Sequence, residues 1–166
     1  MQTPTIIDFE ASGFGKSSYP IEVGFVTETG DGWCSLIKPE FEWQHWDHDA
    51  EMVHHISREV LLQYGKTCGF VADQLNDSLH DRIVYSDGWM YDYIWMARLF
   101  DAADKVPRFQ LEDLRRVLTI EQQNQWHATK SAIQEELHAA RHRASTDAKI
   151  LQLTWLRTCE SLQKIA

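Results

Sequence analysis

Cysteine is scarce in this sequence, and its cysteines form no recognisable thiolate motif. The three, Cys34, Cys68 and Cys159, lie far apart, and their number is odd. Neither a disulfide framework nor a thiolate zinc site is therefore expected. The sequence also lacks an apolar run long enough to cross a membrane, and its first residues lack the basic start and apolar core of a signal peptide. These absences favour a cytoplasmic protein that has no membrane partner.

Basic residues are outnumbered by acidic ones. Of 166 residues, 16 are Lys or Arg and 25 are Asp or Glu, so the formal net charge is −9. Taken alone, this charge argues against sequence-independent binding of a long stretch of nucleic acid, because such binding usually needs a basic face. The argument weakens if several acids are metal ligands, because bound divalent cations would create a positive site for a phosphate. Composition therefore permits a nuclease without favouring one.

The order of predicted elements indicates the fold class. No repeat or linker interrupts the chain, which predicts a single domain over residues 1–166. Short segments rich in apolar and β-branched residues predict strands at 5–9, 21–26, 33–38, 82–86 and 109–111. Apolar residues at helical spacing predict two helices within 60–79, a helix over 89–103 and a mostly helical remainder. The result is an α/β fold in which a mixed central β-sheet of about five strands is flanked by α-helices.

Two acids, Asp8 and Glu10, lie two residues apart at the end of the first predicted strand. Side chains alternate along a strand, so both carboxylates point to the same side of the sheet. Two acids on one half-buried face favour a cation that holds them, because burying unpaired charge is costly. The alternative is that the strand frays at Asp8 and both acids are solvated. The short Asp-x-Glu pattern alone does not decide between the two.

A further acid stands near the C-terminus, at the start of a predicted helix. Ser145 is the expected cap of that helix, which puts Asp147 in the first turn, where the helix dipole favours a carboxylate. His142 lies just before the helix, and a histidine there can take up a proton at neutral pH, as a general base must. Taken singly, the two residues are equally well explained as a helix-start acid and a loop histidine.

The order of these motifs resembles that of the DEDDh exonuclease family, which includes ribonuclease T, oligoribonuclease and the proofreading subunits of DNA polymerases. The resemblance covers nearly the whole chain and rests on Asp8-Phe9-Glu10 with Ser12-Gly13, Ile21-Glu22-Val23-Gly24, Val53-His54-His55-Ile56-Ser57, Tyr91-Asp92, and His142 with Asp147. It implies a ribonuclease H-like fold and a 3′→5′ exonuclease. Such an enzyme hydrolyses phosphodiester bonds at the 3′ end of single-stranded RNA or DNA and releases 5′-mononucleotides.

The resemblance also implies a role for each site residue. Asp8 would bridge two divalent ions, Mg²⁺ or Mn²⁺. Glu10 and Asp147 would complete one ion site, and Asp92 would hold the second ion. His142 would be the general base that deprotonates the attacking water. Oxygen ligands suit these hard cations, and two ions about 3.5–4 Å apart can stabilise both the attacking and the leaving oxygen of an in-line displacement.

One motif departs from the family pattern. The family often has His-Asn shortly before the aromatic residue and the acid, whereas this sequence has Asp87 and Gly88 before Trp89. Asp87 therefore competes with Asp92 as a ligand. Asp92 is preferred because Tyr91 supplies the aromatic position before it and an apolar helix follows. Asp87 is better explained as an acid in the turn after a strand.

Several residues near these motifs are candidates for contacts with substrate. Unpaired bases stack on aromatic rings, which contributes about 1–3 kcal/mol per base. Among three tryptophans considered, Trp43, Trp46 and Trp89, the last has the best claim because it lies three residues before Asp92. The predicted substrate contacts are Ser12, Gly13, Phe14, His55 and Trp89. For His55 the similar family segment also suggests a structural role. Arg141 and Arg143 are candidates for a phosphate contact.

Other functions remain open at this point. A catalytically silent nucleic-acid-binding module with the same fold is the main alternative. An acidic zinc or interaction protein is another, although His45 and His48 lack further zinc ligands at recognisable spacing. The sequence does not decide between RNA and DNA. A homodimer is expected, because a second subunit would supplement the few basic residues.

Overall fold

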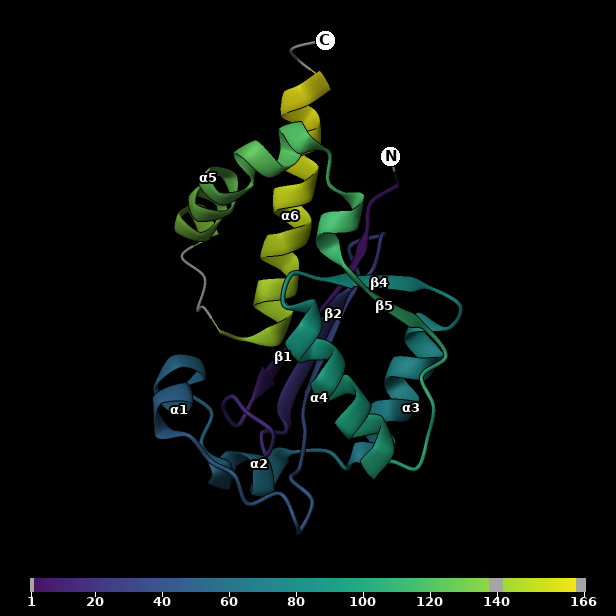
Figure 1. Ribbon diagram of the computed structural model, residues 1–166, viewed down its shortest axis with the longest axis vertical. Coiled ribbons are helices and arrows are strands. Elements are labelled where there is room, and N and C mark those ends of the chain that lie inside the picture. The colour runs from purple at the N-terminus through teal and green to yellow at the C-terminus, as the bar shows by residue number, and fades with distance from the viewer. Residues whose placement is uncertain (1, 138–141, 164–166) are drawn as a thin grey trace.

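In the computed structural model, which describes residues 2–137 and 142–163, a mixed β-sheet forms the centre of the fold (Figure 1). Its five strands are β1 (Thr5–Ala11), β2 (Pro20–Val26), β3 (Gly32–Leu36), β4 (Ile83–Ser86) and β5 (Gln110–Asp113). Their order is β3-β2-β1-β4-β5; β2 is antiparallel to β1 and β3, and β4 is parallel to β1 and β5. The predicted α/β fold with a mixed five-stranded sheet is confirmed.

Helices cover both faces of the sheet (Figure 1). They are α1 (His48–His54), α2 (Arg58–Tyr64), α3 (Cys68–Leu79), α4 (Trp89–Ala102), α5 (Ile120–Leu137) and α6 (Ala144–Gln163), with a 3₁₀ turn at Leu114–Val117. The long α6 lies along one face, with α5 packed beside it, whereas α3 and α4 lie on the other. The two helices predicted within 60–79 are α2, which begins two residues earlier at Arg58, and α3. Within the described ranges, no helix has the length and apolar character needed to cross a membrane.

The core divides into two clusters, one on each face, and β1 contributes to both. Ile7, Phe9 and Ala11 pack in the larger cluster, which includes buried side chains of α3 and α4. Ile6 packs instead with residues of α6, such as Ala148. Because side chains alternate along a strand, Asp8 and Glu10 share the face of Ile6. The first strand therefore directs both acids toward the α6 face, at its C-terminal end.

Candidate metal centre

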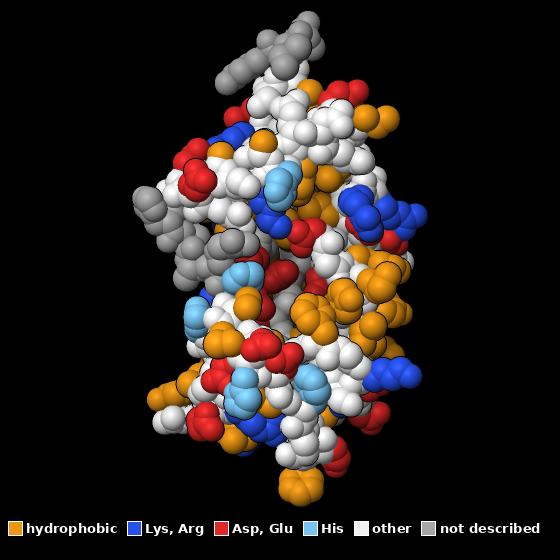
Figure 2. All heavy atoms as spheres, turned by 60° about the vertical axis from the view of Figure 1, so that its left-hand side comes forward, with side chains coloured by type: hydrophobic (Ala, Val, Ile, Leu, Met, Phe, Trp, Pro, Cys, Tyr) orange, Lys and Arg blue, Asp and Glu red, His pale blue; other side chains and the backbone are white. Residues whose placement is uncertain are grey.

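Four acids from three separate segments gather at the C-terminal ends of β1 and β4. Asp8 and Glu10 belong to β1, Asp92 to the first turn of α4, which follows β4, and Asp147 to the first turn of α6. One ligand atom from each of Glu10, His142 and Asp147 lies within 4.8 Å of the others. Asp8 is near enough to Asp92, Glu10 and Asp147 for each to raise its pKa. Figure 2 shows acidic side chains gathered in a hollow of the surface.

Burial and mutual repulsion oppose ionisation of the two acids on β1. The pKa of Asp8 lies well above its ordinary value, first because the carboxyl is buried and then because of neighbouring acids, with Asp92 foremost. Burial also raises the pKa of Glu10 to about 8, and the charges of Asp147 and Glu22 add to the effect. Converging carboxylates that resist losing their protons are well matched to a cation, which would stabilise the ionised forms.

Asp92 and Asp87 have different surroundings, although only five residues separate them. Asp92 is 2% exposed, and burial raises its pKa to about 7, although a hydrogen bond donated by the Ser86 hydroxyl acts in the opposite direction. A Cβ on Gly88 would lie 3.3 Å from an Asp92 carboxylate oxygen. Asp87 is exposed, and its Oδ2 lies 2.8 Å from Nζ of Lys130 on α5. Asp92 is thus the more deeply enclosed of the two acids.

A buried glutamate, which the sequence analysis did not assign to the site, holds the start of α6. Glu22 of β2 is 1% exposed; it accepts hydrogen bonds from Nε and Nη2 of Arg143, the latter at 2.7 Å, and from the backbone N–H of Ala144 at 2.9 Å. A carboxylate there satisfies a free amide at the helix N-terminus and complements the helix dipole. The sequence held two signals for it, namely an acid within an otherwise apolar strand and the segment Ile21-Glu22-Val23-Gly24 in the family resemblance.

This arrangement corrects one expectation. The helix begins at Ala144, so Ser145 lies in the first turn and is not the cap; Glu22 takes that role from across the fold. Arg143 binds Glu22 through its guanidinium group while its side chain remains 45% exposed, and the phosphate contact expected of it stays a prediction. Arg141, the other residue expected to contact phosphate, lies outside the described residues.

A glycine lets α6 approach the sheet closely enough to join the cluster. Gly24 of β2 pairs with Asp8 of β1, and a Cβ on Gly24 would lie only 2.3 Å from the backbone nitrogen of Ser145. A side chain at this position would push the helix start away from the sheet. The close contact brings Asp147 toward β1, where burial raises its pKa. His142 has a positive φ of 61°, and its N–H donates to Asp147 Oδ2 at 2.9 Å.

In the loop after β1, Ser12 and Gly13, two of the predicted substrate contacts, have structural roles. Ser12 is 1% exposed, and its hydroxyl hydrogen-bonds to Nδ1 of His45 at 3.0 Å and accepts the backbone N–H of Tyr19 at 3.1 Å. Gly13 has a φ of 132°, and a Cβ there would lie 2.6 Å from Cβ of Asp47. The Ser12 hydroxyl therefore organises the loop instead of facing solvent, and Gly13 allows α1 to approach it.

Exposed aromatic side chains lie next to the acids. Phe14 is 66% exposed, and its ring centroid is 5.2 Å from that of Tyr91, which the sequence analysis did not consider as a base contact. Trp89 is 37% exposed, and its indole N–H donates to the Leu111 carbonyl at 3.1 Å. Figure 2 shows hydrophobic side chains along one side of the acidic hollow. Phe14 and Trp89 are therefore accessible to a base.

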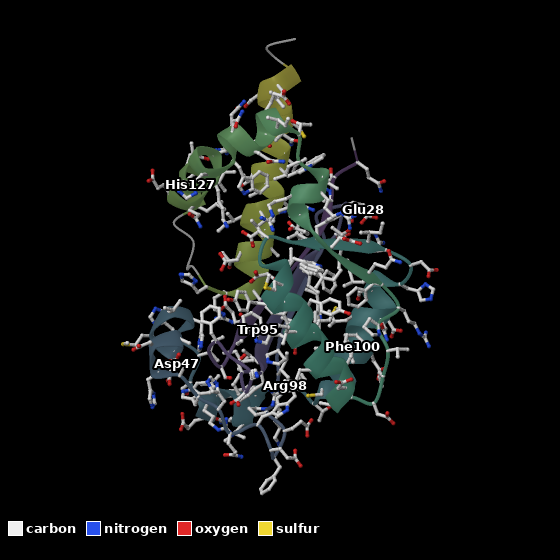
Figure 3. The ribbon with its side chains drawn as sticks, viewed as in Figure 1. Glu28, Asp47, Trp95, Arg98, Phe100 and His127 are labelled. Atoms are coloured by element: carbon white, nitrogen blue, oxygen red, sulfur yellow. The ribbon has the colours of Figure 1, made fainter. Side chains whose placement is uncertain are left out.

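Helix α4 fixes the loop that carries Phe14. Trp95 and Arg98, both labelled on α4 in Figure 3, donate to the hydroxyl and carbonyl of Ser18 at 3.0 Å and 2.9 Å. These bonds tie the end of the loop to the helix that also carries Asp92. Helix α4 therefore positions both the loop that carries Phe14 and the acid Asp92.

The remaining candidates, Trp43, Trp46 and His55, each make contacts within the fold. Trp43 is buried and stacks on Tyr19 at a centroid distance of 5.1 Å, so the expectation that it is available to a base is wrong. Trp46 is half-buried and donates its indole N–H to Glu51 at 2.7 Å. His55 is exposed but ends α1 with a left-handed backbone (φ 57°), and its N–H bonds to the carbonyl of Glu51. That geometry agrees with the structural role considered for His55.

Comparison with known proteins establishes the fold. No protein-family model matches the sequence, and no curated protein matches it significantly. Several solved structures of E. coli exonuclease I do match in three dimensions. The complex with a dA16 oligonucleotide has 12% sequence identity and a TM-score of 0.63, covering 98% of this chain and 43% of that chain. The zinc-bound form of the complex with single-stranded DNA has 13% identity and a TM-score of 0.67, covering 95% and 40%.

A third match, the product-bound structure, has 13% identity and a TM-score of 0.63, with 98% of this chain and 44% of that chain covered. The chain thus spans about two fifths of the length of these solved structures. Such low identity establishes the fold alone. Together with the strand order, the matches show that this chain has the ribonuclease H-like fold of E. coli exonuclease I.

Proposed function

We propose that this protein is a metal-dependent 3′→5′ exonuclease that removes 5′-mononucleotides from the 3′ ends of single-stranded nucleic acid. One observation carries the proposal: four acids converge at the C-terminal ends of β1 and β4, with His142 beside them. The acids are Asp8, Glu10, Asp92 and Asp147. These are the residues that the family resemblance singles out. A fold shared with an exonuclease supports the proposal independently.

The donor set fits two divalent cations. All four acids offer oxygen ligands, which suit Mg²⁺ or Mn²⁺. Burial raises the pKa of each, and repulsion from other acids of the cluster adds to the effect at Asp8 and Glu10. Asp8, whose pKa responds to all three other acids, would contact both ions. Glu10 and Asp147 would complete one site and Asp92 the other. Such ions stabilise the charge on the attacking and leaving oxygens of a phosphodiester. The zinc-bound exonuclease I structure is consistent with a metal site in this fold.

His142 is the proposed general base. A ring nitrogen of His142 lies within 4.8 Å of ligand oxygens of Glu10 and Asp147, and the bond from its backbone N–H to Asp147 holds the segment in place. From this position the imidazole would take the proton of the attacking water. Phe14 and Trp89 would stack on unpaired bases, which favours a single strand over a duplex.

Digestion of labelled single strands in Mg²⁺ or Mn²⁺ tests the proposal. Asp8→Ala and His142→Ala are expected to lose activity, whereas Asp31→Ala in the β2–β3 turn and His127→Ala on the exposed side of α5 (Figure 3) are expected to retain it. Equal activity in all five proteins would refute the assignment. Strand binding without cleavage by the wild type would favour the silent binding module.

Matched RNA and DNA oligonucleotides in the same assay identify the preferred sugar. The positions of released label distinguish the direction of digestion. A 3′-labelled strand should release its label as a mononucleotide at the start of the reaction, whereas a 5′-labelled strand should shorten in steps.

A further inference from the structure

A lysine on α5 lies at the acid cluster, although its helix carries none of the four acids. Nζ of Lys130 lies 2.8 Å from Oδ2 of Asp87, and the two side chains are 27% and 38% exposed. The positive charge of Lys130 lowers the pKa of Asp147, while the charge of Asp87 raises those of Asp8 and Asp92. The pair therefore connects α5 to the β4–α4 turn beside the proposed metal ligands.

The ion pair between Lys130 and Asp87 is easily exchanged for a pair between Lys130 and another anion. An ion pair between partly exposed side chains contributes only about 0–1 kcal/mol, and a lysine ammonium is a mobile point charge with three donors. Arg143, the cation next to Glu10, is not exchanged so easily, because its guanidinium group is bonded to the buried carboxylate of Glu22. A backbone phosphate would offer Lys130 a charge-assisted hydrogen bond of the same kind as the Asp87 carboxylate does.

We propose that Lys130 binds a backbone phosphate of the nucleic-acid strand entering the acid cluster, and that Asp87 competes with this phosphate for the ammonium group. The inference rests on the proposed function, since it needs a strand at the site. It assigns α5 a part in substrate binding and gives Asp87 a role other than that of metal ligand. Without substrate, Asp87 holds Lys130; with substrate, the phosphate displaces Asp87.

This exchange predicts that substitutions of Lys130 and of Asp87 change the dissociation constant of a single strand in opposite directions. Lys130→Ala should raise the dissociation constant of a short single strand about tenfold, the size expected for a lost hydrogen bond to a charged group. It should also reduce the salt slope of binding by about 0.7, the value for one phosphate contact on a single strand. Asp87→Asn should instead lower the dissociation constant about threefold, because the competing carboxylate is gone. Lys130→Arg should bind more tightly than Lys130→Ala.

The experiment measures fluorescence anisotropy of a short fluorescein-labelled oligothymidylate in Ca²⁺, over a series of salt concentrations. Its essential arm is the double variant Lys130→Ala with Asp87→Asn. If Asp87 acts through Lys130, the Asp87→Asn substitution should have no effect in the Lys130→Ala background. The matched control is a second Lys–Asp pair, Lys105 with Asp73, which joins α3 to the segment after the C-terminus of α4. Lys105→Ala should leave the dissociation constant unchanged.

Each alternative gives a different pattern. If the pair only ties α5 to the turn, both single variants weaken binding alike and the proposal is overturned. If Asp87 merely repels the strand, Asp87→Asn tightens binding equally in both backgrounds, which also overturns it. Wild-type binding without cleavage would refute the exonuclease while leaving this comparison intact. A wild type that neither binds nor cleaves single strands would overturn both proposals.

Discussion

The metal-free protein should become more stable when Glu10 loses its ability to ionise. An unfolded chain ionises this carboxyl at a pKa of 4.5, whereas in the fold burial and the neighbouring Asp147 raise the pKa to about 8. Between these values the folded protein keeps a proton that the unfolded chain releases, so stability falls as the pH rises from about 4.5 to 8. Asp8 and Asp92, whose pKa values are also raised, act in the same direction.

The size of the effect follows from the two pKa values. One pH unit of difference corresponds to about 1.4 kcal/mol, so ionisation of Glu10 destabilises the fold by up to about 4 kcal/mol at pH 8 and by about 1 kcal/mol at pH 5. Glu10→Gln removes this penalty. For a chain of this length 1 kcal/mol shifts the melting temperature by about 2–4 °C, so the variant should melt on the order of 10 °C higher at pH 8 in EDTA.

Thermal melts at pH 5 and pH 8 measure this difference, with the exposed Glu135→Gln on α5 as the control. Manganese should reverse the ranking, because it binds the folded wild type through Glu10 and stabilises it by mass action. The reasoning is refuted if Glu10→Gln melts no higher than the wild type at pH 8 in EDTA, or if its gain is the same at both pH values.

Four further outcomes are expected. Gly24→Ala should destabilise the protein by about 1–3 kcal/mol in urea unfolding, because its Cβ would overlap the start of α6 at Ser145; a wild-type midpoint would contradict this. Glu22→Gln should cost up to about 3 kcal/mol and reduce nuclease activity, since it weakens the anchor on Arg143, and an unchanged midpoint and rate would argue against that anchor. Phe14→Ala should raise KM for single strands about tenfold through lost base stacking, and an unaltered KM would remove Phe14 from the site. Digestion of long strands should be distributive and fall steeply with salt, whereas processive digestion at high salt would oppose so small a set of phosphate contacts.

Local periodicity predicted those parts of the site that depend on neighbouring residues. Alternation along a strand was enough to place Asp8 and Glu10 on one face, and the core packing of Ile7 and Phe9 on the opposite face agrees. The position of Asp147 in the first turn of α6 is confirmed, although it was predicted from Ser145 as the cap and the helix begins one residue earlier, at Ala144. In both cases a spacing of a few residues determines the geometry.

Contacts between segments that are distant in the sequence could not be predicted from local periodicity. Glu22 and Arg143 are 121 residues apart, and neither sequence neighbourhood reveals the other. The link between Lys130 and Asp87 depends on how α5 packs, and the burial of Trp43 depends on Tyr19 stacking against it. The cap of α6 was assigned to the wrong residue for the same reason, since a buried carboxylate from β2 replaced a local hydroxyl.

Helix α1 was missed although the sequence holds a signal for it. The helix is short and mostly polar, so it lacks an apolar stripe, and His54 is its buried residue. The side chain of Asp47 caps it by accepting the N–H of Asp49, and acids occupy its first turn. An Asp followed by acids is a helix-start pattern, but without apolar periodicity it was not enough to predict a helix.

Calorimetric titration of manganese into the metal-free protein is the sharpest test of the proposed two-ion centre. We expect uptake of two ions per chain with release of protons, because the acids with raised pKa values must ionise to bind them. Asp8→Asn should abolish or severely weaken both binding events. No uptake at millimolar manganese, or equal uptake by Asp8→Asn, would mean that these acids do not form a metal centre.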